Sequence, residues 1–109
     1  MRVYQNHQGA QRLAVADLVY LEGDLNYTWL HWVDGQRSLV PYCLKRLSAS
    51  LPPTWFVRSH RHYLVNCQFI NRIEVRSKKA ILYLHTGESL PLSRRCWSLL
   101  RQTVSVYRQ

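Results

Sequence analysis

The sequence has 109 residues, of which 47 % are hydrophobic and 19 % are charged, a composition typical of one globular domain and not of a disordered chain. Fifteen Lys and Arg stand against six Asp and Glu, so the net charge is +9. The polar N-terminus, the short apolar runs and three widely spaced cysteines argue against a signal peptide, a membrane span and a disulfide framework, and we expect a cytoplasmic protein.

Short strands separated by turns dominate the first part of the chain. Leu13–Leu21 predicts a strand, and Glu22–Asp24 predicts the turn after it. Tyr27–Val33 predicts a second strand that is bulky on both faces and therefore covered on both sides. Asp34-Gly35 then predicts a type I′ hairpin turn, followed by a partner strand at Gln36–Val40.

A short helix is predicted at Tyr42–Leu51, because leucines recur there at helical spacing and Pro52-Pro53 follows. Ser93 predicts the N-cap of a final helix with an apolar stripe of Trp97, Leu100 and Val104. Between these helices, strands are predicted at Trp55–Val57, Tyr63–Asn66, Phe69–Val75, Ala80–His85 and Ser89–Leu92. The sequence therefore predicts a mainly β domain with one or two short helices.

Catalytic and metal-binding patterns are missing from the sequence. There is no glycine-rich phosphate loop and no nucleophile elbow, and carboxylates are too few for a paired acid–base site. His60, His62 and Cys67 are close in sequence, but alternation along a strand puts Cys67 on the opposite face from the two histidines. We therefore expect no enzyme, no bound metal, no cofactor and no small-molecule substrate.

The positive charge is concentrated in the second half of the chain. Residues 1–54 contain five basic and four acidic residues, whereas residues 55–109 contain ten and two. The run Arg58–His62 places four cationic or potentially cationic side chains beside aromatic residues, which suits a surface that grips phosphates. Internal ion pairs are the alternative reading, but six acidic residues are too few to pair with every cation.

Two further cations, Arg94 and Arg95, stand at the predicted start of the final helix. The helix dipole disfavours cations at that end, so their placement points to an external anion. An arginine near a duplex can also read guanine with two hydrogen bonds. The alternative is a solvated pair of arginines.

The stretch Trp55–Asn66, WFVRSHRHYLVN, resembles the hallmark of the LytTR family of bacterial DNA-binding domains, roughly Phe-Phe-Arg-x-His-Arg-Ser-Tyr-x-Val-Asn. Asp17–Asp24 resembles the family's first strand, with Asn26-Tyr27 following it. Leu44–Leu47 resembles its short helix, and Gly87–Arg94 resembles its closing strand and Ser-Arg motif. The matching hallmark residues are Phe56, Arg58, His60, Arg61, Tyr63, Val65 and Asn66.

This resemblance covers nearly the whole chain and implies both a fold and a function. The implied fold is an elongated β-β-β sandwich of three short antiparallel sheets. The implied function is sequence-specific binding of double-stranded DNA in transcription regulation, through loops that enter the major groove. Paired half-sites, and with them a homodimer on DNA, are also implied. We expect a single domain over residues 1–109 without a receiver domain, either a stand-alone regulator or an excised domain.

The motif positions implied to contact DNA are Thr28, Cys43 and Arg94, with Arg94 the firmest match. Some relatives carry better base readers at the first two positions, so the neighbours Asn26, Tyr42 and Lys45 are alternatives. The full set of predicted DNA-contacting residues is Arg94, Arg95, Asn26, Tyr27, Thr28, Tyr42, Cys43, Lys45, Arg58, Arg61 and His62.

Two other functions remain open at the level of sequence. A β-domain could bind RNA or single strands by stacking bases on Tyr27, Trp29 and Trp32. The predicted covering of their strand on both faces disfavours this alternative. The third candidate is a protein-interaction module that docks acidic partners. No membrane partner is expected.

Overall fold

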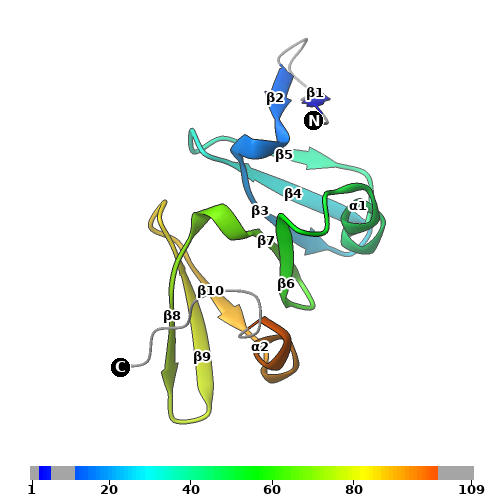
Figure 1. Cartoon of the computed structure of the whole chain (residues 1–109). Coiled ribbons are helices and arrows are strands. Elements are labelled where there is room, and N and C mark those ends of the chain that lie inside the picture. The colour runs from blue at the N-terminus through cyan, green and yellow to red at the C-terminus, as the bar shows by residue number, and fades with distance from the viewer. Residues whose placement is uncertain (1–2, 6–11, 101–109) are drawn as a thin grey trace.

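The computed structural model describes residues 3–5 and 12–100, and Figure 1 shows them as a molecule built mainly from β-strands. Its principal extents are 45 × 25 × 20 Å. At the N-terminal end, β1 (Val3–Gln5) pairs with β2 (Arg12–Ala14) as a short antiparallel ribbon. The body of the domain consists of two antiparallel sheets, one of five strands and one of three.

The five-stranded sheet has the order β5-β4-β3-β7-β6, so β3 lies at its centre. Its strands are β3 (Leu18–Asp24), β4 (Tyr27–Trp32), β5 (Arg37–Val40), β6 (Phe56–His60) and β7 (Tyr63–Asn66). The three-stranded sheet has the order β10-β9-β8, with strands β8 (Ile70–Arg76), β9 (Lys79–Leu84) and β10 (Ser89–Leu92).

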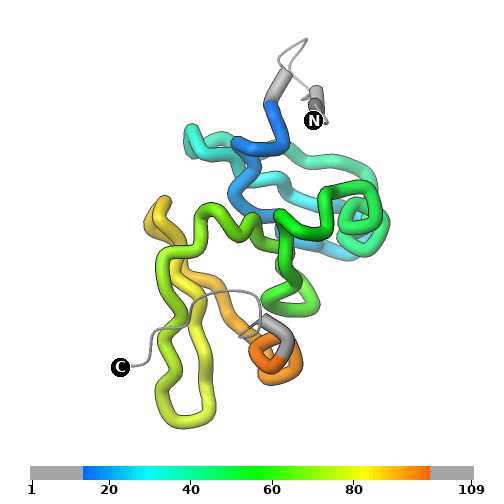
Figure 2. The backbone as a smooth tube through the Cα atoms, viewed as in Figure 1, coloured from blue at the N-terminus to red at the C-terminus, as the bar shows by residue number. Residues whose placement is uncertain are grey.

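The described residues also form four short helical segments, of which three connect strands and the last follows β10. They are the 3-10 turns η1 (Val15–Asp17) and η2 (Cys67–Phe69), and the α-helices α1 (Leu44–Ser50) and α2 (Arg94–Leu100). Figure 2 follows the backbone from the five-stranded sheet through η2 to the β8–β9 hairpin at the other end of the molecule. No helix in the described part of the chain is long and apolar enough to cross a membrane.

The five-stranded sheet separates two hydrophobic cores. On one face, Leu44 and Leu47 of α1 pack with Leu21 and Leu30 of the sheet. On the other face, the three-stranded sheet and α2 cover a second core. A register shift between Leu18 and Tyr20 interrupts the alternation of β3, so that Val19 and Tyr20 both contribute to this second core. Burial of both faces of β3 between Leu18 and Leu21 explains why these four residues form a continuous apolar run.

The predicted sandwich of three short sheets is wrong. Strand β3 pairs with β4 on one edge and with β7 on the other, in the register Tyr20↔Val65. Five strands therefore join in a single sheet, and one three-stranded sheet packs against it. Apart from these two, the described strands form only the β1–β2 ribbon.

Two of the predicted turns also need correction. Glu22–Asp24 does not form a turn, because these residues extend β3, and the chain reverses at Leu25-Asn26 instead. The predicted hairpin at Asp34-Gly35 is present, but its turn is not type I′, because Gly35 has a positive φ of 88° and Asp34 does not. The Asp34 carboxylate instead accepts the Gln36 N–H at 3.0 Å.

The predicted element boundaries shift in several places. The strand expected at Leu13–Leu21 is interrupted by η1, and the helix expected at Tyr42–Leu51 is limited to α1. The strand expected at Trp55–Val57 runs as far as His60. Tyr63–Asn66 and Ser89–Leu92 are confirmed as predicted.

Ser93 is confirmed as a cap at the start of α2. Its hydroxyl accepts the backbone N–H of Cys96 at 3.2 Å, which satisfies one of the donors left free at a helix start. The predicted stripe residue Val104 lies outside the described residues, as does the side chain of Leu100.

Candidate nucleic-acid interface

Three loops that are far apart in sequence are tied together by two hydrogen bonds. The Gly23 N–H donates to the His62 carbonyl at 2.8 Å, which joins β3 to the β6–β7 turn. The Thr28 hydroxyl donates to the Tyr42 carbonyl at 2.7 Å, which joins β4 to the segment before α1. A Cβ at position 23 would lie 3.2 Å from Leu44 Cβ, so glycine permits this close approach. The β3–β4 hairpin is therefore linked both to the β6–β7 turn and to the segment before α1, and all three contain predicted DNA-contacting residues.

The β6–β7 hairpin contains most of the predicted basic run. Arg58 Nε donates to the His60 carbonyl at 3.0 Å, and Arg58 Nη2 donates to the Arg61 carbonyl at 2.7 Å. This guanidinium thus braces the backbone of the turn, while Arg61 and His62 remain exposed. The rings of His60 and His62 lie 5.5 Å apart. The turn consequently presents cations on a fixed backbone.

A groove of about 710 Å³ lies between this hairpin, α1 and α2. Figure 1 shows α1, the β6–β7 hairpin and α2 following one another down one side of the molecule. The lining of the groove has no carboxylate among the described residues, and we call it the cationic groove. Its lining residues are Lys45, Arg58, His60, Arg61, Ser93, Arg95 and Cys96.

Burial lowers the pKa of His60, and the charges of His62, Arg61 and Arg58 lower it further. The surroundings of this imidazole therefore favour its neutral form when the groove is empty of anions. A phosphate in the groove would have the opposite effect, because an anion stabilises the protonated ring.

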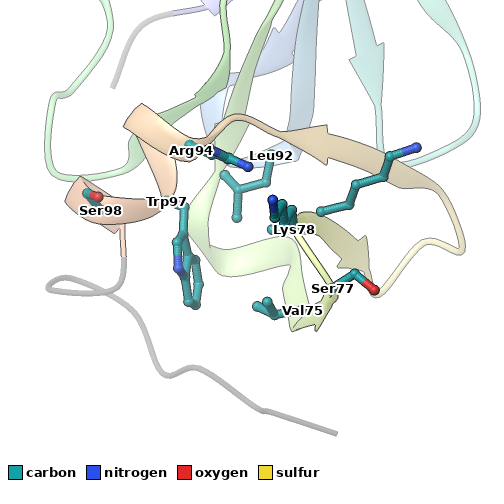
Figure 3. A pocket seen from close by; sticks show the side chains of 9 residues that line it. Val75, Ser77, Lys78, Leu92, Arg94, Trp97 and Ser98 are labelled. Atoms are coloured by element: carbon teal, nitrogen blue, oxygen red, sulfur yellow. The ribbon is translucent and has the colours of Figure 1, made fainter.

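The two arginines at the start of α2 lie on different surfaces. Arg95 lines the cationic groove, whereas Arg94 lines a separate hollow of about 350 Å³ beside the β8–β9 hairpin. Consecutive helix residues project about 100° apart, which explains the divergence. Figure 3 shows Leu92 and Trp97 beside this second hollow, with Arg94 and Lys78 at its edge. The structure therefore does not bring the Ser-Arg motif arginine into the groove.

The remaining predicted residues differ in how accessible they are. Asn26, Tyr27, Tyr42 and Cys43 are exposed, with Tyr27 at 50 % and Tyr42 at 42 %. Thr28 has no exposed surface, and its hydroxyl is engaged with the chain. The side chain of Thr28 is thus placed to hold the loops together.

Sequence reasoning missed four exposed side chains of this region and its surroundings. The guanidinium of Arg46 lies 4.7 Å from the centre of the Tyr42 ring, next to the predicted Lys45. Leu25 is 91 % exposed at the β3–β4 turn. The other two are Lys78 and Lys79, which line the hollow beside Arg94. The missed cations could have been predicted, because each is part of an adjacent basic pair, Lys45-Arg46 or Lys78-Lys79. No sequence pattern indicated a role for Leu25.

The aromatic residues of β4 do not form a stacking platform. Trp32 is buried, and its indole N–H donates to the Ser38 hydroxyl at 3.1 Å. Trp29 is half-buried, and the Arg37 guanidinium lies 4.3 Å from the centre of its ring. Only Tyr27 of the three proposed stacking residues is exposed. This geometry disfavours binding of single strands through β4.

No group of three potential metal ligands occurs among residues 3–5 and 12–100. Cys67 is half-buried, and burial raises the pKa of its thiol. A raised pKa disfavours the thiolate that metal binding or nucleophilic attack needs.

Cations from three elements line one groove, and the acidic side chains of the described residues lie elsewhere. Together with the mainly β fold, this arrangement defines the chain as a basic nucleic-acid-binding domain.

The chain belongs to the LytTR family, because the model of the LytTr DNA-binding domain matches residues 9–105. This is the DNA-binding domain of bacterial transcription regulators and is not an enzyme. The chain thus binds DNA in transcription regulation.

One relative is the CO-responsive transcriptional regulator RcoM of Rhodospirillum rubrum, which is 30 % identical over 93 residues. The match covers 84 % of this chain but 39 % of that regulator, so the chain spans about two-fifths of its length. A similar solved structure is the LytTr DNA-binding domain of a Bacillus cereus protein described as a methyl-accepting/DNA response regulator. It has a TM-score of 0.81 and 23 % identity, covers 95 % of each chain, and supports the fold.

Proposed function

We propose that the domain binds double-stranded DNA sequence-specifically, with its loops in the major groove. The observation that carries this proposal is that the hydrogen bonds from Gly23 and Thr28 hold three loops together. One of these loops, the β6–β7 turn, lines the cationic groove together with residues of α1 and α2. A groove lined by cations attracts the phosphate backbone, and protruding loops on a rigid sheet can reach base edges.

The contacts divide into two kinds. Lys45, Arg61 and Arg95 supply charge to the phosphate backbone, and Arg58 holds the turn that carries Arg61. The exposed loop residues read bases, and they are Asn26, Tyr27, Tyr42, Cys43 and His62. Thr28 positions the loops and does not contact DNA, since its hydroxyl donates to the Tyr42 carbonyl.

Arg94 reads bases or phosphates from the adjoining surface beside Lys78 and Lys79. The DNA footprint then extends from the cationic groove across the start of α2 to the β8–β9 hairpin. We also propose that two molecules occupy paired half-sites on one duplex, as the family resemblance implies.

Selection of bound fragments from a genomic duplex library tests the proposal, with the purified chain at two salt concentrations. We expect a recurring motif whose enrichment persists at the higher salt, because base contacts do not release counterions. Loss of all enrichment at higher salt would mean phosphate binding alone. Tighter binding of poly-dT than of any duplex would favour the single-strand alternative.

A further inference from the structure

The β3–β4 hairpin ends in a turn whose first residue is unexpected. Asp24 pairs with Tyr27, so Leu25 and Asn26 form a two-residue turn. Both common turns of this length need a positive φ at their first residue, which favours Gly, Asn or Asp. Leu25 occupies that place with φ 58° and is 91 % exposed. The position therefore combines a disfavoured backbone conformation with an apolar side chain in water.

The surroundings hold this turn in place. Gly23, on one side, is bonded to the His62 carbonyl, and Thr28, on the other, is bonded to the Tyr42 carbonyl. These bonds tie the strands on either side of the turn to two neighbouring loops. Leu25 therefore lies at the tip of an anchored hairpin, beside the exposed Tyr27, within the proposed DNA-binding loops.

A second hairpin shows that the geometry does not require leucine. Arg76 pairs with Lys79 in the β8–β9 hairpin, so Ser77 and Lys78 form a turn of the same length. Ser77 has φ 53°, close to that of Leu25, but it is a small polar residue. The backbone conformation of the turn therefore does not account for the isobutyl group of Leu25, which suggests that the side chain has a role of its own.

We propose that Leu25 determines specificity by packing against the C5-methyl group of thymine in the major groove. The thymine methyl is the apolar feature of the base edges in that groove, and an aliphatic side chain is its natural partner. Because the hairpin that carries Leu25 is anchored, binding has to order little more than the side chain itself. This inference rests on the proposed sequence-specific binding and names one of its base-reading residues.

Substitution of deoxyuridine for thymine tests the contact, because it removes the methyl group and leaves base pairing intact. Each thymine of the selected motif is replaced in turn, and binding to each duplex is measured. We expect wild-type protein to lose affinity about 4-fold at one position, as for one buried methyl group. The Leu25→Gly variant should bind the thymine and deoxyuridine duplexes equally at that position.

Leu25→Gly keeps the turn, since glycine accepts a positive φ, so its thermal midpoint should not fall. Val33→Gly is the control, because it removes another exposed aliphatic side chain at a position outside the proposed contacts, and it should keep the wild-type discrimination. Persistent discrimination in Leu25→Gly, or none at any thymine in the wild type, would overturn the inference. If Leu25→Gly keeps the wild-type ratio of affinities for the thymine and deoxyuridine duplexes but self-associates less than the wild type, Leu25 contacts protein and the inference is also overturned. A library without an enriched motif would instead refute the proposed function.

Discussion

At the scale of single residues, neighbours in sequence have different surroundings. Arg94 and Arg95 are adjacent, but one lies beside the β8–β9 hairpin and the other beside Lys45 and Arg61. Arg58 and Arg61 differ in a similar way, because the first is bonded to the turn and the second projects from it. Each cation therefore needs its own functional test.

Arg94→Ala should weaken binding to the selected duplex by about 1–3 kcal/mol and spare random duplex, if Arg94 reads a base. Arg95→Ala should weaken binding to the selected and the random duplex equally, because a phosphate contact does not depend on the base sequence. Titrations of both variants on both duplexes measure the difference. Equal losses for Arg94→Ala would show that Arg94 contacts only phosphate.

DNA affinity should rise as pH falls below about 6.5, the usual histidine pKa. Burial and the charges of His62, Arg61 and Arg58 lower the pKa of His60 in the free protein. Lys45 and Arg95 share its groove, while Glu22, Asp24 and Tyr63 line the hollow on its other side. Phosphates raise that pKa in the complex, so binding takes up a proton and acid favours it.

Affinity measured from pH 8 to pH 5 at constant ionic strength checks this expectation. His60→Gln should flatten the pH profile. His85→Gln, at an exposed position outside the groove, is the control and should leave the profile as in the wild type. A rise in affinity that survives His60→Gln would assign the effect to another group.

At the scale of elements, one buried side chain fixes the passage between the two sheets. Asn66 ends β7, and its amide donates to the Leu18 carbonyl at 2.9 Å. Its side-chain oxygen accepts the Gln68 N–H at 3.0 Å, which caps η2 before β8 begins. The side chain has no exposed surface. The match of Asn66 to the family hallmark thus has a structural cause.

Asn66→Ala should lower the free energy of unfolding by about 2–3 kcal/mol, because it removes two hydrogen bonds and leaves a buried carbonyl without its donor. Urea denaturation measures the change. Gln68→Ala is the control, since that side chain is exposed and its backbone N–H is retained, and it should cost no more than about 0.5 kcal/mol. A comparable loss in both variants would contradict the assigned role of Asn66.

At the scale of the whole molecule, the ion pairs of the described residues do not involve the cations of the cationic groove. Among the described residues, the buried Glu74 forms ion pairs with Arg76 and Arg72, and Glu22 is hydrogen-bonded to His31. No described carboxylate pairs with Lys45, Arg61 or Arg95. The excess charge is thus available to an external polyanion, which distinguishes it from a charge that serves only solubility.

Binding to random duplex should depend steeply on salt. Three phosphate contacts from Lys45, Arg61 and Arg95 predict a slope of about −3 for log K against log salt concentration, and steeper if Arg94 and Lys78 also contribute. The triple variant with glutamine at the first three positions should make the slope shallower by about that amount. A flat dependence in the wild type would instead favour the protein-interaction module.

The local sequence pattern determined the β class, the bounds of β7 and β10, the family resemblance and the uneven charge. Each depends on residues close together in the chain, such as the strand residues Tyr63–Asn66 or the run Arg58–His62. Strand periodicity and turn residues report local conformation, which is why these predictions were confirmed.

Only the tertiary structure decided that β3 pairs with both β4 and β7, and so that five strands share one sheet. The structure also shows that Arg94 lies outside the groove that Arg95 lines. It further shows that Leu25 adopts a positive φ. Pairing between distant strands depends on burial of the whole core, which no local pattern encodes. The arrangement of the proposed interface therefore depends on tertiary packing, whereas its basic and polar side chains could be identified from the sequence.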